Sequence, residues 1–473
     1  MSAPTVPPVL ERLFKIGERG STVGREVRGG VTTFFAMAYI LVLNPIVLGG
    51  AEDKFGNQLS GVQLVTATAL VAAVTTVLMG LAANIPLALA AGLGINALVA
   101  YQIVPTMSWP DAMGLVVLSG VVVCVLAVTG VREAIMYAVP QQMKQAISVG
   151  IGLFIAFVGF VDAGFTTRAP GGSGSVPVRL GGDGTLSGWP VLVFCLGVLL
   201  TAALLVRGVN GAILIGIVVM TAVAVAVNEI AGLAPEEWGL TVPSVPEDVV
   251  ALPDFGLVGE FSLFGAVEQV GTLTVVLLVF TIFLTDFFDT MGTAVGISSE
   301  AGLLDEEGRV PNLGRLLFVD GLAAVAGGAA SASSSTSFVE SAAGVGEGAR
   351  TGLANLVTGT LFALALLLTP LATVVPAQAA APALITVGFL LMAQVRNIDW
   401  THFEIAVPAF LTIAVMPFTY SITNGIGAGF IAYLVLQAVA GRARRVPWLL
   451  WLVGGLFVVY FAIDPIEQLL GVD

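Results

Sequence analysis

Charged residues are scarce in this sequence: they make up 10% of its 473 residues, whereas hydrophobic residues make up 57%. Soluble domains carry roughly 25% charged residues, so the composition excludes an ordinary globular protein. Alternation of apolar and polar residues, the mark of membrane-spanning strands, is also lacking. Long apolar runs recur instead between Gly29 and Ile463, each long enough to cross a bilayer as a helix. The sequence therefore predicts an all-α polytopic membrane protein.

Cysteine and histidine are also rare. Cys124 and Cys195 lie inside apolar runs, where a thiol packs as a small hydrophobic group, so neither a disulfide framework nor a metal cluster is expected. The single histidine, His402, lies at the boundary of an apolar run beside Trp400 and Glu404, which favours a surface role over proton transfer. We predict no cofactor, no metal site and no catalytic residue.

About fourteen apolar runs are predicted to span the membrane. They cover residues 29–49, 62–83, 86–104, 112–131, 141–164, 190–206, 210–230, 264–290, 311–328, 331–347, 352–370, 378–395, 402–421 and 424–441. The long loop at 232–262 divides them into two groups of seven. Because seven is odd, the second group enters the membrane inverted, so a 7+7 inverted repeat is expected. A further apolar stretch, 448–463, suits either an interfacial helix or another span.

The distribution of basic residues indicates the orientation. Residues 1–28 hold five basic side chains and lack a signal-peptide core, so the N-terminus is expected in the cytoplasm, with the first run retained as a span. Only Lys54, Arg168 and Arg179 then fall outside, whereas the others, Arg132 among them, fall inside or at the inner boundary. The predicted location is the inner (plasma) membrane.

The third and tenth spans contain many small, helix-breaking or hydroxyl residues. The third begins Pro-Leu-Ala-Leu-Ala-Ala-Gly-Leu-Gly-Ile-Asn at 86–96, and the tenth begins Ser-Ala-Ser-Ser-Ser-Thr-Ser-Phe-Val-Glu at 331–340. They occupy equivalent positions in the two halves, and such a pair of interrupted spans points to a central site. Backbone groups freed by the interruptions should line a cavity, because lipid would leave them unsatisfied.

Four acids lie deep inside predicted spans, where each costs roughly 2.5–3.5 kcal/mol to insert. Asp286 and Asp289, three residues apart, are expected on one helical face, where one could hold a proton; solvation at a helix end is the alternative. Glu340 is expected to contact a planar polar ligand, or else to cap a neighbouring helix. Asp320 is expected to be a structural partner of backbone groups. Asn96 could contact the ligand or join two helices.

At these residues the sequence resembles a known family. Thr-Ser-Phe-Val-Glu at 336–340, followed by Ala-Gly-Val at 343–345 and Gly-Ala-Arg-Thr at 348–351, resembles the tenth-span signature of the nucleobase–ascorbate transporter superfamily. Three further runs are similar to its adenine/guanine/hypoxanthine permease branch: Thr-Asp-Phe-Phe-Asp-Thr-Met-Gly at 285–292, Gly-Leu-Gly-Ile-Asn-Ala at 92–97, and Phe-Phe-Ala-Met-Ala-Tyr-Ile-Leu-Val-Leu-Asn-Pro at 34–45. The likeness covers nearly the whole chain.

The resemblance implies a core domain and a gate domain, each assembled from both halves of the chain. The expected segments are a cytoplasmic N-terminal segment (1–28), the core domain (29–131 and 264–370), the gate domain (132–231 and 371–441), an extracytoplasmic loop (232–263), and a C-terminal basic linker with an apolar helix (442–473). It also implies a homodimer in the bilayer and no nucleic-acid partner.

The function implied is secondary active uptake of a purine nucleobase (adenine, guanine or hypoxanthine) by proton symport, with alternating access between core and gate. Sodium is the alternative coupling ion. By motif, the substrate-binding residues would be Glu340, Asn96, Asp286, Thr336, Ser337 and Phe338. Proton coupling would fall to Asp286, Asp289 and Glu340.

Two other functions compete with purine uptake. An anion carrier on the same 7+7 fold is disfavoured, because acids without a deep Lys or Arg repel anions. An intramembrane aspartyl protease would use paired acids, but these normally come from two facing spans, whereas Asp286 and Asp289 share one.

Overall fold

The computed structural model describes residues 7–129, 139–168, 178–182, 184–209, 211–239, 241–246, 248–305 and 309–462. Arg132 and the predicted core–gate boundary at 131/132 lie outside these residues. Within them, ten helices are long and apolar enough to cross a membrane, and three shorter apolar helices accompany them. The predicted helical, polytopic membrane architecture is confirmed, with two short antiparallel strand pairs in addition.

The first half of the chain contains helices, one short central strand and a two-stranded hairpin. Its elements are α1 (Pro8–Phe14), α2 (Val23–Met37), α3 (Ile40–Gly49), α4 (Gly61–Ala82), β1 (Leu89–Ala91), α5 (Leu93–Leu98), η1 (Val99–Ile103), η2 (Val104–Thr106), α6 (Trp109–Thr129), α8 (Gln141–Asp162), β2 (Thr166–Arg168), β3 (Val178–Leu180), α9 (Trp189–Val206), α10 (Ala212–Ala231) and α11 (Pro235–Trp238).

The second half repeats this plan, with one strand near the start of its third span. Its elements are α12 (Gly265–Glu300), α13 (Leu313–Ala329), β4 (Ser335–Ser337), α14 (Ser341–Gly346), α15 (Leu353–Ala365), η3 (Leu366–Leu368), α16 (Thr369–Thr373), α17 (Ala377–Met392), η4 (Ala393–Asn397), α18 (Phe403–Phe418), α19 (Ile422–Val439), η5 (Ala443–Arg445) and α20 (Trp448–Phe461).

The predicted spans correspond to these elements, and the third and tenth are interrupted as expected. Each consists of a short strand followed by a short helix: β1 with α5, and β4 with α14. The eighth span differs most from its prediction. Helix α12 continues to Glu300 instead of ending at 290, and its geometry breaks at Gly271, where φ is +79°. The sequence from 290 to 300 is rich in Thr, Ser and Gly, so hydropathy alone did not predict its helix.

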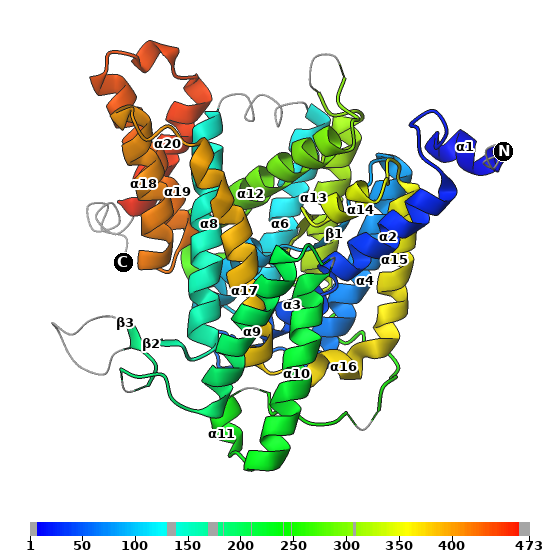
Figure 1. Cartoon of the computed structure of the whole chain (residues 1–473). Helices are drawn as coiled ribbons and strands as arrows, with labels where there is room; N and C mark the ends of the chain where they lie inside the picture. The colour runs from blue at the N-terminus through cyan, green and yellow to red at the C-terminus, as the bar shows by residue number, and fades with distance from the viewer. Residues whose placement is uncertain are drawn as a thin grey trace.

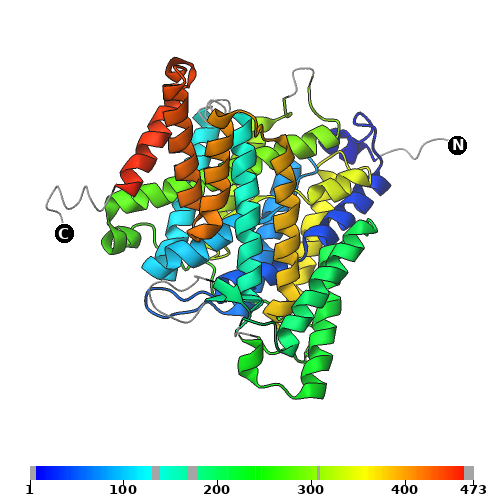
Figure 2. The same cartoon turned by 60° about the vertical axis from the view of Figure 1, so that its left-hand side comes forward.

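Helix contacts fall mainly into two sets (Figure 1). In one set α6 packs on α13, α15 packs on α4 and α2, and α14 packs on α2. In the other α8 packs on α17 and α18, α9 packs on α10 and α17, and α18 packs on α19. Helices α8 and α17 run side by side in both views (Figures 1 and 2). Small residues permit that approach: a Cβ on Gly152 would lie 2.7 Å from the Gly388 carbonyl oxygen.

The two ends of the molecule carry different elements. Helix α1 and the turn between α19 and α20 lie at one end, and β2, β3 and α11 lie at the other (Figure 1). The first end therefore carries Arg442, Arg444 and Arg445 together with Arg12 of α1.

The apolar stretch after Arg445 forms α20, which packs on α19. The Phe457 ring stacks on Phe430 of α19 at 6.2 Å between centroids and lies 6.1 Å from Phe280 of α12. A helix of this length rises about 21 Å, less than the roughly 30 Å of a hydrocarbon core. The described part of α20 is thus shorter than the hydrocarbon core.

Candidate functional site

The two interrupted spans cross at the centre of the molecule, where β1 pairs with β4 antiparallel. The register sets Leu89 opposite Ser337, Ala90 opposite Thr336 and Ala91 opposite Ser335. Two further backbone bonds extend the ladder: Gly92 donates to the Ser334 carbonyl and Phe338 donates to the Ala88 carbonyl, each at 2.9 Å. Pairing the two interruptions satisfies backbone groups that lipid could not, which explains why both spans break at matching positions.

Gly92 permits the closest approach at this crossing. A Cβ there would lie 2.7 Å from Cγ2 of Thr336, closer than two carbon atoms normally pack. The Thr336 hydroxyl is engaged with that of Thr290, with 2.8 Å between the oxygens. The Gly-Leu-Gly run thus brings the third span against the tenth.

Side chains from neighbouring helices support β1 from its other side. Thr76 of α4 both donates to the Leu89 carbonyl and accepts from the Leu89 amide, each at 2.9 Å. Asn355 of α15 donates to the carbonyls of Ile85 and Leu87, at 3.0 and 2.8 Å. Polar side chains inside apolar helices therefore hold the interrupted span in place.

Three of the predicted acids lie on helices beside the crossing. Asp286 of α12 is buried and accepts a long hydrogen bond of 3.5 Å from Ser334. Asp320 of α13 is buried and accepts from Thr290 at 2.7 Å and from Ser337 at 3.3 Å. Asp289 is only partly buried, within electrostatic range of Asp320. The i, i+3 pair of α12 therefore does not share one environment.

Glu340 occupies the N-cap position of α14, but its side chain makes no capping hydrogen bond. Its carboxylate accepts a hydrogen bond from the hydroxyl of Tyr39, which lies in the break between α2 and α3. Tyr39 is buried, and its ring centroid lies 6.5 Å from that of Phe338. Glu340 is also within electrostatic range of Asp289. The first, eighth and tenth spans thus meet around this carboxylate.

Asn96 lies one turn into α5 and is completely buried. Its Nδ2 donates to Oδ1 of Asn44 in α3 at 2.6 Å. Asn44 in turn donates to Thr68 at 2.7 Å and to the Ala332 carbonyl at 3.2 Å. Asn96 therefore joins two helices, and its Oδ1 has no hydrogen-bond partner in the described part of the chain.

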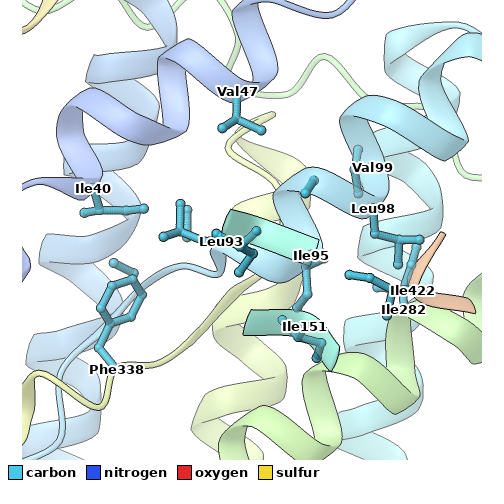
Figure 3. Close-up of a cluster of buried hydrophobic side chains, with 14 of the residues drawn as sticks. Ile40, Val47, Leu93, Ile95, Leu98, Val99, Ile151, Ile282, Phe338 and Ile422 are labelled. Atoms are coloured by element: carbon cyan, nitrogen blue, oxygen red, sulfur yellow. The ribbon is translucent and has the colours of Figure 1, made fainter. Parts of the chain in front are cut away.

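Apolar side chains flank this polar crossing. Figure 3 shows Phe338 beside Ile40, and Leu93 and Ile95 of α5 near Ile151 of α8. No Lys or Arg occurs within residues 85–106, 265–300 or 331–346, so the segments that build the site are free of cations. The site combines acids, an amide and hydroxyls with an apolar wall.

The predicted residues Glu340, Asn96, Asp286, Thr336, Ser337 and Phe338 all belong to α12 or to the two crossing segments that pack against it. Three residues of the site were not predicted from the sequence: Tyr39, Asn44 and Thr290. The first two lie in the quoted run at 34–45, where a tyrosine and an asparagine inside an apolar span were the available signal. Among the described residues, no group of three or more His, Cys, Asp or Glu could hold a metal ion.

His402 lies far from these acids in sequence, between η4 and α18. Its side chain is 62% exposed and its Nδ1 lies 2.7 Å from Oδ2 of Asp399. Hydrogen bonds from Thr401, through its side chain and its backbone, and from His402 lower the pKa of Asp399 to about 2. His402 is thus part of an exposed turn.

The fold is similar to that of solved anion transporters. The transmembrane domain of a cyanobacterium bicarbonate transporter, BicA, matches with a TM-score of 0.59 at 14% identity, covering 87% of this chain and 97% of that one. The structure of SLC26A9 matches with a TM-score of 0.61 at 10% identity, covering 90% of this chain and 68% of that one. At such identities the likeness shows the fold alone, which is the expected 7+7 arrangement.

Sequence relatives are much closer. The guanine/hypoxanthine permease PbuG of Bacillus subtilis is 39% identical over 95% of this chain and 98% of its own length. The adenine permease AdeP of Escherichia coli is 35% identical over 95% of both chains. These relatives are permeases, so the chain is not an enzyme and the protease alternative is wrong. The model of the permease family matches residues 24–427, and this chain belongs to that family.

Proposed function

We propose that this protein takes up purine nucleobases by proton symport. The observation that carries the proposal is the pairing of β1 with β4 in segments that contain no Lys or Arg. Glu340 and Asn96 lie on these paired segments, and Asp286 lies on α12, which packs against them. Purine bases are flat and uncharged and carry both N–H donors and ring-nitrogen acceptors, which acids, amides and hydroxyls can pair. The permeases named for guanine, hypoxanthine and adenine support the same substrate class.

The binding roles follow from the surroundings of each side chain. Glu340 accepts from base N–H groups while Tyr39 holds its other hydrogen-bonding position. Phe338, beside Tyr39, offers an aromatic face for the flat base. Thr336 and Ser337 line the strand next to Glu340, and Asp320 acts through their hydroxyl network rather than on the base.

Proton coupling is assigned to Asp286, Asp289 and Glu340. A carboxylate in a cation-free membrane segment is costly when ionised, so proton uptake and base binding can favour each other there. Asp289, like Glu340, is only partly buried, and it is the entry point for the proton in this proposal. Sodium is the alternative coupling ion, and the experiment below separates the two.

Alternating access would come from motion of a core domain against a gate domain, the two sets into which the helix contacts fall. The end that carries α1 with Arg12 also carries Arg442, Arg444 and Arg445 between α19 and α20, which favours an N-terminus in the cytoplasm of a plasma-membrane protein. A homodimer in the bilayer completes the proposed assembly.

The test is uptake of radiolabelled hypoxanthine, guanine and adenine into proteoliposomes under an imposed proton gradient. Unlabelled purines should compete, sulfate and bicarbonate should not, and a protonophore should abolish accumulation. Asp286→Asn and Glu340→Gln should each abolish uptake at normal protein yield, whereas Glu236→Gln, an exposed acid of α11, should not.

The opposite results discriminate the alternatives. Accumulation driven by a sodium gradient in the absence of a proton gradient would show that sodium, and not the proton, is the coupling ion. Competition by sulfate or bicarbonate without competition by purines would identify an anion carrier. Retention of proton-driven accumulation in both Asp286→Asn and Glu340→Gln would refute the assigned roles.

A further inference from the structure

The run at 34–45 contains Asn44, whose side chain is hydrogen-bonded to Thr68, Ala332 and Asn96. We propose that Asn44 is a positioning residue that fixes the direction of the Asn96 carbonyl oxygen, so that the transported base must present an N–H group to that oxygen. The inference rests on the proposed function and adds which hydrogen-bonding group of the base Asn96 recognises. Asn44 is itself completely buried.

The direction of each hydrogen bond follows from atoms whose roles are fixed. The Ala332 carbonyl can only accept, so Asn44 must turn its Nδ2 toward it, at 3.2 Å. The same Nδ2 donates at 2.7 Å to Thr68, whose own hydroxyl hydrogen is directed to the Leu64 carbonyl at 2.6 Å. Asn44 is therefore left with Oδ1 facing Asn96.

An amide oxygen can only accept, so Asn96 must in turn direct its Nδ2 to Asn44, at 2.6 Å. A flipped Asn96 would set two carbonyl oxygens against each other and lose this bond. The orientation of Asn96 is thus dictated by the Ala332 backbone through Asn44.

The remaining atom is Oδ1 of Asn96. It is buried and has no hydrogen-bond partner among the described residues. A buried acceptor without a donor is unfavourable, and native structures leave few of them, often at functional positions. A ligand N–H directed at this oxygen would satisfy it, whereas a ring nitrogen with a lone pair would be repelled.

The test compares hypoxanthine with its N1-, N3-, N7- and N9-methyl isomers, using equilibrium binding to the purified full-length protein. Methylation at the nitrogen that faces Asn96 removes the donor, and a site built for that donor rejects such a ligand strongly. We expect one isomer to bind wild-type protein at least about tenfold more weakly than hypoxanthine, and Asn44→Val to reduce that ratio by about tenfold. The reduction should come from weaker binding of hypoxanthine.

The matched control is Asn355→Val. Asn355 is another buried asparagine that donates to backbone carbonyls beside the same interrupted span, but it has no bond to Asn96. Its replacement should lower stability without altering the isomer ratio. Because a positioning residue acts only through its target, Asn44→Val should have no further effect on the ratio in an Asn96→Leu background.

The outcomes separate the two proposals. Lack of hypoxanthine binding by wild-type protein would contradict the proposed function itself. If wild-type protein binds hypoxanthine but Asn44→Val weakens all five ligands in proportion, as a purely structural residue would, the positioning role is wrong. If Asn44→Val does not fold, Asn44→Asp decides: in its protonated form the carboxyl group donates to the Ala332 carbonyl and still accepts from Asn96, so it should keep the isomer ratio, and loss of the ratio would overturn the inference.

Discussion

Replacing Gly92 by alanine tests whether the close crossing of the interrupted spans is needed for function. The new Cβ would lie 2.7 Å from Cγ2 of Thr336, whereas carbon atoms pack at roughly 3.5–4.0 Å. The strands would have to separate by about 1 Å, or Thr336 would have to rotate and give up its 2.8 Å bond to Thr290. Overpacking of this kind costs about 1–3 kcal/mol.

A second substitution should relieve the clash. Thr336→Ser removes Cγ2 but keeps the hydroxyl that meets Thr290, so Gly92→Ala combined with Thr336→Ser should recover most of the lost stability. The coupling between the two sites should be about 1–3 kcal/mol, the size of the overpacking penalty. Thermal unfolding of purified protein and hypoxanthine binding should both show this recovery.

Gly296→Ala is the matched control, because apart from the adjoining backbone of α12 no heavy atom of the described residues lies within 4 Å of a Cβ at that position. It should leave the unfolding temperature unchanged or slightly raised, since alanine favours a helix over glycine. The reasoning would be refuted if Gly92→Ala behaved like Gly296→Ala, or if Thr336→Ser failed to restore stability and binding.

The remaining predictions concern the hydrogen bonds beside the site. Tyr39→Phe removes the donor to Glu340, a bond to a charged group worth about 1.5–3 kcal/mol, so unfolding should become easier by about that amount, and hypoxanthine affinity should fall because Glu340 is no longer held in place; unchanged affinity would contradict a role in positioning Glu340. Asp320→Leu leaves the hydroxyls of Thr290 and Ser337 without their acceptor, so unfolding should become easier by about 1–3 kcal/mol for each hydroxyl that finds no substitute. The folded fraction of Asp320→Leu should still bind hypoxanthine, and loss of binding at normal stability would make Asp320 a ligand contact instead.

The interruptions and the intramembrane acids could be predicted from the sequence, because both violate what an apolar span normally contains. Gly92 and Gly94 in one span, and the serines before Glu340 in the other, signalled broken helices in matching positions. The rarity of acids in spans singled out Asp286 and Asp320. These signals are local and can be seen without knowing what faces them.

The partners of these residues could not be predicted. Tyr39 meets Glu340 across 301 positions of sequence, and Asn44 meets Asn96 across 52, so no spacing rule connects either pair. A single tyrosine or asparagine in an apolar span is also common enough to be dismissed. The different burial of Asp286 and Asp289 depends on the elements packed around α12, which helical periodicity does not reveal.

The most direct test of the account is an experimental structure of the protein with hypoxanthine bound. We expect the base at the β1–β4 crossing, with one N–H directed at Oδ1 of Asn96 and another polar contact to Glu340. A base bound elsewhere, with Asn96 and Glu340 keeping only their bonds to Asn44 and Tyr39, would contradict it.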